Sequence, residues 1–187
     1  MLNLIDLKDG GLMDFFEHTL ERTEVFQGKI ITLETQMVEV QDGNTAYREI
    51  VRHPGGVCIL ARDENDKILL VRQYRKPMEE AYLELPAGKL EKDLTPYENA
   101  VKELEEETGY RCNDLIHLAT LATSPGFCDE KIHLYMAKKL EKGTKGGDDD
   151  EFISIVRLSD AEFIEHIKTG QIKDAKTVAA YSLSKII

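Results

Sequence analysis

The sequence predicts an α+β fold in which a mixed β-sheet is sandwiched between α-helices in an α/β/α arrangement. Strand-like apolar runs follow one another across short polar turns, and helical patterns interrupt them at irregular intervals, which excludes a regular βαβ repeat. Hydrophobic residues make up 42% of the 187 residues, enough to build a core. We expect residues 51–187 to form the main domain and residues 1–50 to form a lead-in with an antiparallel strand extension.

The extension is predicted from a hairpin pattern. Residues 1–20 have an irregular or helical pattern. Lys29–Val40 and Thr45–His53 have the pattern of strands, and the Asp-Gly dipeptide within Gln41–Asn44 predicts the turn between them.

The main domain begins with a second predicted hairpin, in which Gly55–Arg62 and Lys67–Tyr74 flank the polar turn DEND. Later apolar runs predict strands at Leu115–Thr123, Lys131–Ala137 and Phe152–Leu158. Two helices are expected to end the chain, because Ser159 and Glu162 match a capping box and Asp174 is a second N-cap candidate.

A further helix is predicted between the second hairpin and the later strands. Thr95 and Glu98 match a capping box, Pro96 suits the first helical position, and Gly109 suits a left-handed stop. We therefore expect a helix over Pro96–Thr108. At about 100° per residue, one stripe expected to pack on the sheet contains Tyr97, Ala100, Val101, Leu104 and Thr108.

The end of this helix, KELEEETG, gathers four carboxylates where the helix dipole disfavours them. Glu103 and Glu107 are one turn apart and lie side by side on one flank of the stripe, whereas Glu106 points further outward and Glu105 lies on the other flank. Two neighbouring carboxylates at the edge of a buried stripe can share a hard cation. The alternative is a solvated polar face, and spacing alone does not decide between the two.

Charge and cysteine content narrow the function classes. The formal net charge of −11, without a basic cluster, argues against nucleic-acid binding, whereas divalent cations can still bridge the protein to a small phosphorylated ligand. Cys58, Cys112 and Cys128 have no paired spacing, which argues against a disulfide framework or a cysteine zinc site. No apolar stretch has membrane-spanning length, and the N-terminus is acidic rather than signal-like, so we expect a cytoplasmic protein without a membrane partner.

The segment GKLEKDLTPYENAVKELEEETGY, from Gly88 to Tyr110, resembles the Nudix box. Two positions depart from that pattern: Leu94 stands where the family has Glu, and Lys102 where it has Arg. Lys102 keeps the charge but loses the bidentate fork of Arg, and Leu94 removes a supporting carboxylate, so we expect a slower or less rigid site. The positions that match are Gly88, Glu103, Leu104, Glu106, Glu107, Gly109 and Tyr110.

The resemblance extends over about Glu24 to Ile187 and is to the ADP-ribose pyrophosphatase branch of the Nudix family. Pro125 lies sixteen residues after Gly109, where this branch carries a proline. The other segments that resemble the branch are REIVRHPG from Arg48, VRQYRKP from Val71, ELPAG from Glu84, SPGF from Ser124 and IKDAKT from Ile172.

The resemblance implies a Nudix fold and hydrolysis of ADP-ribose to AMP and ribose 5-phosphate, with Mg²⁺ or alternatively Mn²⁺ as cofactor. It implies that Glu103, Glu107 and the Ala87 carbonyl are metal ligands, and that Glu106 is a ligand or supports one and takes part in catalysis. The general base is expected in the loop GGDDDEF, with Glu151 as first choice and Asp149 as second.

For the substrate phosphates, the resemblance implies contacts from Arg48 and Arg75, with Arg72 as a third candidate. The group that stacks on adenine is not identified by the resemblance, and Phe26 and Tyr47 are both candidates. In relatives the N-terminal strands pack across a two-fold axis, so the resemblance also implies a homodimer.

Other interpretations stay open at this point. The substrate could instead be a nucleotide sugar, a dinucleotide coenzyme or an oxidised nucleoside diphosphate, because the metal helix would be unchanged. A Nudix-fold sensor that binds ADP-ribose without hydrolysis would agree with Leu94 and Lys102, although the ligand carboxylates are kept. An acidic interaction module would leave the register of the whole box unexplained.

Overall fold

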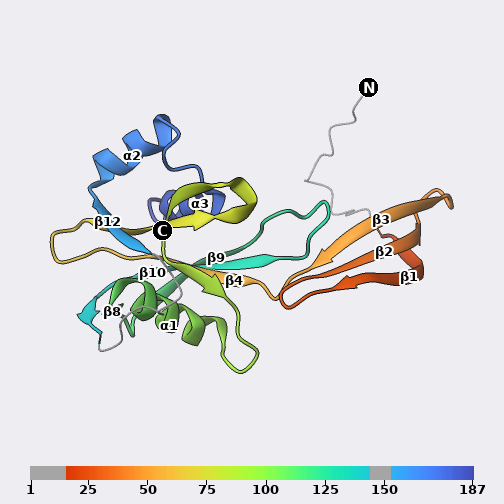
Figure 1. Ribbon diagram of the computed structural model, residues 1–187, viewed down its shortest axis with the longest axis horizontal. Coiled ribbons are helices and arrows are strands. Elements are labelled where there is room, and N and C mark those ends of the chain that lie inside the picture. Colours follow the sequence, from red (N-terminus) through yellow and green to blue (C-terminus); the bar gives the residue numbers. More distant parts are fainter. Residues whose placement is uncertain (1–15, 144–152) are drawn as a thin grey trace, which may run out of the picture. The chain divides into compact units, whose positions relative to one another are not determined.

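The computed structural model describes residues 16–143 and 153–187 (Figure 1). The chain divides into two compact units, of which the first ends at Val51 and the second begins at Arg52. The dimerisation role expected for residues 1–50 stays a prediction.

The first unit is a three-stranded sheet in the order β1-β2-β3. Its strands are β1 (His18–Gln27), β2 (Thr32–Glu39) and β3 (Thr45–Arg52), and β1 is antiparallel to β2. The lead-in predicted for residues 1–20 is wrong from His18 onward, because β1 begins there. All ten residues of β1 are exposed, and two register shifts interrupt its pairing, so its sequence lacks the period-two alternation of a half-buried strand.

The second unit contains two larger sheets. One has the order β7-β4-β10-β9 and is mixed, because β10 is parallel to β4 while the other pairs are antiparallel. Its strands are β4 (Gly56–Leu60), β7 (Ala87–Lys89), β9 (Leu115–Ala122) and β10 (Lys131–Ala137). The antiparallel second sheet has the order β12-β5-β6, with β5 (Ile68–Arg75), β6 (Glu80–Glu84) and β12 (Ser154–Leu158). Shorter elements are η1 (Lys76–Met78), β8 (Tyr110–Arg111) and β11 (Glu141–Lys142).

The second predicted hairpin is wrong beyond its turn, because β4 and β5 belong to different sheets. The segments that join them pair next to the turn, at the bridge between Arg62 and Ile68 and through a 2.9 Å hydrogen bond from the Leu69 amide to the Ala61 carbonyl. All five residues of β4 are buried, and so are the first four of β5. Such continuous apolar runs do not reveal which neighbour a strand takes, and the parallel partner of β4 comes from the distant β10.

Three helices complete the described part of the second unit: α1 (Pro96–Thr108), α2 (Asp160–Lys168) and α3 (Ala175–Leu183). The caps predicted at Thr95, Ser159 and Asp174 all form, and Gly109 ends α1 with φ of 71°. No helix within residues 16–143 and 153–187 combines the length and apolar character needed to cross a membrane.

The helices cover both faces of the mixed sheet, with α1 and α3 on opposite sides (Figure 1). Side chains alternate along β4, so Cys58 and Leu60 join the core cluster of α2 and α3, whereas Val57 and Ile59 pack with Leu104 of α1. The α+β class and the α/β/α arrangement are therefore confirmed.

The buried stripe of α1 differs in part from its prediction. Ala100, Leu104 and Thr108 are buried as expected, but Tyr97 is 38% exposed. Asn99 is fully buried because its side chain accepts a hydrogen bond from the Glu91 amide at 3.0 Å and donates to the carbonyls of Leu94 and Thr95. Glu105 is also buried.

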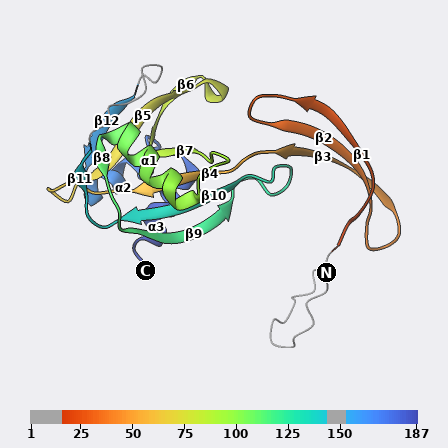
Figure 2. The same ribbon diagram turned by 90° about the horizontal axis from the view of Figure 1, so that it is seen from below.

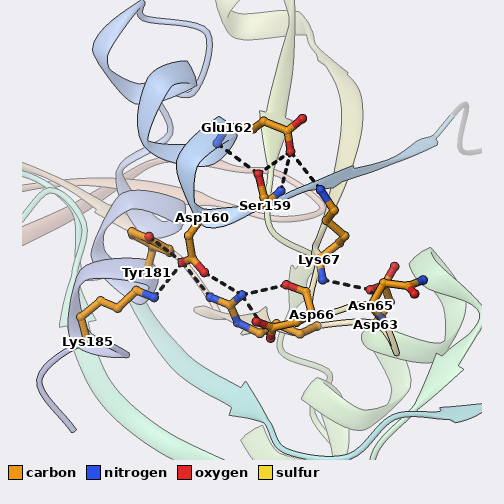
Figure 3. Close-up of polar contacts among 10 residues, drawn as sticks. Asp63, Asn65, Asp66, Lys67, Ser159, Asp160, Glu162, Tyr181 and Lys185 are labelled. Carbon is orange, nitrogen blue, oxygen red and sulfur yellow. Dashed lines mark hydrogen bonds and ion pairs between the residues drawn. The ribbon is translucent and has the colours of Figure 1, made fainter.

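A polar cluster around Asp160 joins the turn after β4 to α2 and α3 (Figure 3). The Asp160 carboxylate accepts two hydrogen bonds from Arg62, at 2.9 and 3.0 Å. It also accepts one from the Tyr181 hydroxyl and one from Lys185 Nζ, both at 2.7 Å. The hydrogen bonds from Arg62 lower the pKa of Asp160 well below its ordinary value and outweigh the effect of burial.

This cluster predicts a contribution to the free energy of unfolding that is lost at low pH. A lowered pKa stabilises the fold above the unfolded value, about 3.9, and the contribution is lost as pH falls toward the folded value. Because the Asp160 side chain is 38% exposed, solvent screening limits the contribution to about 1 kcal/mol. We expect Asp160→Asn to lose this amount at pH 7. Its free energy of unfolding, measured in urea, should decline less steeply than that of the wild type as the pH falls below about 4.

Asp66→Asn is the matched control, because Asp66 contacts the same Arg62 at 3.4 Å but its side chain is 83% exposed. We expect its stability profile to follow that of the wild type. An Asp160→Asn profile that also matched the wild type would contradict a stabilising role of the cluster.

Candidate active site

The two carboxylates predicted to hold metal both lie against the short strand β7. Glu107 Oε2 accepts a hydrogen bond from the Ala87 amide at 2.9 Å. A Cβ added to Gly88 would lie 1.9 Å from the carboxyl carbon of Glu103. The carboxyl group of Glu103 therefore occupies the space that Gly88 leaves by lacking a side chain.

Helix and sheet packing produces this arrangement. α1 lies across β4 and β7 (Figure 2), and β7 pairs with β4 so that Ala87 is opposite Cys58. Residues 103 and 107 are one helical turn apart and project from the same flank of α1. The backbone of Ala87 is thereby placed beside both carboxylates, while the role of its carbonyl as a ligand stays a prediction.

Lys102 occupies the position at which the Nudix box has Arg. Its Nζ lies 2.6 Å from Glu91 Oε1 and 3.1 Å from Glu106 Oε2. The hydrogen bond with Glu91, assisted by the one with Glu106, raises the pKa of Lys102 and keeps it charged. Lys102 therefore fixes the position of the Glu106 carboxylate on α1.

This contact predicts unequal effects of two substitutions. Lys102→Met removes the cation that contacts Glu106. With Glu106 in its predicted role at the metal, we expect the affinity for the activating metal to fall about tenfold, the loss typical of residues that orient a metal ligand. Lys102→Arg keeps a charged donor, and we expect less than about a threefold change. Titration of activity with Mg²⁺ measures both, and equal effects would show that Lys102 does not orient Glu106.

A second charged group lies on β5 and β6. Arg75 Nε and Nη2 donate to the two carboxylate oxygens of Glu84 at 2.7 and 2.8 Å, and Lys176 Nζ donates to the same carboxylate. The Glu84 side chain is only 2% exposed. Burial opposes its ionisation, but the bonds from Arg75 and the charge of Lys176 outweigh burial and lower its pKa. The pKa of Arg75 is raised, chiefly by Glu84 and in part by the charge of Glu107.

The three arginines predicted to bind substrate are placed differently. Arg75 shares a strand face with Glu84, whereas Arg72, an odd number of residues away on β5, is exposed on the other face. Arg48 belongs to the first unit, where its guanidinium pairs with Glu17 at 2.5 and 3.0 Å. The predicted bases Glu151 and Asp149 lie outside the described residues.

Glu84 and Lys176 were not predicted as site residues. Both belong to segments that resemble the family, ELPAG and IKDAKT. A single acidic residue in a strand and a single lysine ninety-two positions later give no sequence signal of a contact. The contact between Glu84 and Lys176 forms only when the tertiary fold places α3 beside β6.

The residues beside β7 fit a hard divalent cation, although no group of three or more His, Cys, Asp or Glu side chains within residues 16–143 and 153–187 forms a complete metal cluster. The space at Gly88 admits the carboxylate of Glu103 next to the backbone of β7. Carboxylate and carbonyl oxygens are the donors that Mg²⁺ and Mn²⁺ prefer.

A protein-family model described as the NUDIX domain matches residues 52–181 of the chain. The chain therefore belongs to the Nudix family of hydrolases, and the resemblance noted in its sequence is confirmed. Two similar relatives are a methanol dehydrogenase activator of Bacillus methanolicus and an ADP-ribose pyrophosphatase of Bacillus subtilis (strain 168). The first is 48% identical over 168 residues, which cover 89% of this chain and 91% of the relative. The second is 40% identical over 166 residues, which cover 88% and 90%.

A solved structure supports the same family fold. The chain is similar to a crystal structure of an ADP compounds hydrolase, with a TM-score of 0.80 and 25% sequence identity. The match covers 90% of this chain and 92% of that one.

Proposed function

We propose that this protein hydrolyses the pyrophosphate bond of ADP-ribose to give AMP and ribose 5-phosphate, with Mg²⁺ as its metal and Mn²⁺ as an alternative. The observation that carries the proposal is the placement of Glu103 and Glu107 together against β7. The choice of ADP-ribose is supported by 40% identity to the Bacillus subtilis enzyme over most of both chains.

In this proposal Glu103, Glu107 and the Ala87 carbonyl hold the metal, and Glu106 is a further ligand or a supporting carboxylate. When bound, the metal neutralises charge on the pyrophosphate and lowers the pKa of the attacking water. Glu151, or otherwise Asp149, accepts a proton from that water as general base.

The arginines supply the positive charge that the acidic site lacks. Arg75 offers a guanidinium to a substrate phosphate. Arg48, in the first unit, and Arg72, on the other face of β5, stay candidates from the family resemblance alone. A guanidinium suits this role because its planar fork binds two phosphate oxygens at once.

The proposed assembly is a homodimer in the cytoplasm, without nucleic-acid or membrane partners. The first unit exposes large apolar side chains that a second copy would cover: Phe16, Leu20, Val25, Phe26 and Tyr47. Cys58, Cys112 and Cys128 are all free, which suits a reducing compartment. Sedimentation equilibrium tests the dimer, since the mass of a single 21.2 kDa chain would contradict it.

The deciding experiment is AMP release from ADP-ribose with Mg²⁺, run beside ADP-glucose, NADH and an oxidised nucleoside diphosphate, with EDTA as control. Fast Mg²⁺-dependent release from ADP-ribose alone is the expected result. Faster turnover of another compound would change the substrate, and binding of ADP-ribose without release from any compound would indicate a sensor.

A second candidate function is activation of an alcohol dehydrogenase, because the relative with 48% identity is a methanol dehydrogenase activator. Adding the protein to methanol dehydrogenase and following methanol oxidation tests this function. If the rate of methanol oxidation rises with the wild type but not with the hydrolytically inactive Glu107→Gln variant, activation depends on hydrolysis. If the rate does not rise with the wild type, the protein does not activate that enzyme.

A further inference from the structure

The first turn of α3 is fixed to the segment that leads into β7. Asp174, the N-cap, accepts hydrogen bonds from the Thr177 amide at 3.0 Å and from the Thr177 hydroxyl at 2.6 Å. The same hydroxyl accepts a hydrogen bond from the Leu85 amide at 2.9 Å. Thr177 and Leu85 are both fully buried, so the start of α3 has a defined position beside the end of β6.

Lys176 follows the cap and joins two carboxylates. Its Nζ donates to Glu84 and lies 3.0 Å from Asp174 Oδ1. The side chains of Lys176 and Asp174 are only 17% and 16% exposed, so water competes little for their charges. Together with Arg75, the group contains two cations and two carboxylates and is electrically balanced.

One edge of the Arg75 guanidinium is bound to Glu84, and the other edge faces away from that carboxylate. Among residues 16–143 and 153–187, its side-chain hydrogen bonds use Nε and Nη2 and go to Glu84. The Arg75 side chain is 38% exposed, and the remaining edge, which includes Nη1, carries the donors that fit a phosphate. The orientation of that edge depends on where the Glu84 carboxylate lies.

From these contacts we infer that Lys176 is a positioning residue for the substrate. It fixes the Glu84 carboxylate, which in turn orients Arg75 toward a phosphate of a nucleoside diphosphate. This inference rests on the proposed function of the site. Lys176 does not itself touch the substrate, so its effect on binding must pass through Arg75.

A double-mutant cycle tests this dependence through the Kd of ADP-ribose, measured calorimetrically in EDTA so that no hydrolysis occurs. We expect Arg75→Lys to weaken binding about 30-fold and Lys176→Met about tenfold, within the range for charge-assisted hydrogen bonds. Independent effects would multiply to about 300-fold. If Lys176 acts through Arg75, the double variant stays within about threefold of Arg75→Lys alone.

Turnover with Mg²⁺ gives a second readout. We expect Lys176→Met to raise KM for ADP-ribose about tenfold while kcat changes less than about threefold, because binding rather than chemistry is affected. Lys176→Arg, which keeps the charge, should restore most of the affinity. Should Lys176→Met fail to fold, Glu84→Gln takes its place in the same cycle with Arg75→Lys.

Lys185→Met is the matched control, because Lys185 also pairs with a carboxylate, Asp160, just beyond the other end of α3 (Figure 3). It should lower thermal stability without changing the Kd. Effects that multiply in the cycle, or an equal loss of affinity in Lys185→Met, would overturn the inference. If the wild type binds ADP-ribose without hydrolysing it, only the proposed function is contradicted. The double-mutant cycle of Arg75 and Lys176 would still test the positioning role. Neither binding nor hydrolysis would contradict both.

Discussion

Glu107→Gln is expected to lower kcat for ADP-ribose by about a thousandfold, at the upper end of the loss seen when one group that stabilises transition-state charge is removed. The substitution replaces a carboxylate by an amide of the same shape. The amide oxygen can still accept the hydrogen bond from Ala87, which Glu107 now accepts at 2.9 Å. The contact between α1 and β7 should therefore persist, while the negative charge that attracts a divalent cation is lost.

The measurement combines thermal unfolding, kcat and a Mg²⁺ titration. Glu98→Gln is the matched control, because it removes one charge from the same helix at a residue whose partner is the exposed cap residue Thr95. We expect a melting temperature close to that of the wild type for both variants and a loss of turnover for Glu107→Gln only. Near-normal hydrolysis by Glu107→Gln would refute the assignment of this carboxylate to the metal site.

The extent of the helix that carries the carboxylates could be predicted from sequence, although part of its buried face could not. Its start at Thr95 and its end at Gly109 are local features, because a capping box and a left-handed glycine involve residues within one turn. The placement of Glu103 beside Glu107 follows from helical periodicity alone. The structure adds what they face, namely the backbone of β7 and the space at Gly88.

The strand pairings could be predicted only in part. β1 is exposed along its whole length and is interrupted by two register shifts, so neither burial nor alternation marks it. β4 and β5 have uninterrupted buried runs, which suggested a hairpin, but the parallel partner of β4 lies more than seventy residues later in β10. Parallel pairing is set by tertiary packing, which a local pattern does not contain.

The charged group around Glu84 shows the same limit at the site. Arg75 was predicted as a phosphate contact from resemblance, but the carboxylate that holds it was not. Glu84 is stable as an anion at 2% exposure only because Arg75 and Lys176 reach it from another strand and from a helix. Arg75 comes from the paired strand β5, but Lys176 lies ninety-two positions later in the chain, so the complete group exists only in the folded protein.

Gly88→Ala is expected to lower activity about a hundredfold with little loss of stability, because displacing a reacting group by about 1 Å can cost this much. The added methyl group would lie 1.9 Å from the carboxyl carbon of Glu103 and 2.0 and 2.4 Å from its oxygens. The clash involves the end of a flexible side chain rather than backbone, so Glu103 can rotate away at small cost to the fold. It then leaves its position beside Glu107, and the pair can no longer share a cation.

Gly170→Ala is the control with the opposite expectation. Gly170 has φ of +73° with no atom within 4 Å of an added Cβ, so alanine meets backbone strain but no neighbour. That strain should lower the free energy of unfolding by about 1 kcal/mol while kcat and the Mg²⁺ dependence stay unchanged. Urea unfolding and Mg²⁺-dependent turnover, measured on both variants, separate the two effects. A Gly88→Ala variant that kept full turnover would show that the position of Glu103 in this structure is not the one the reaction requires.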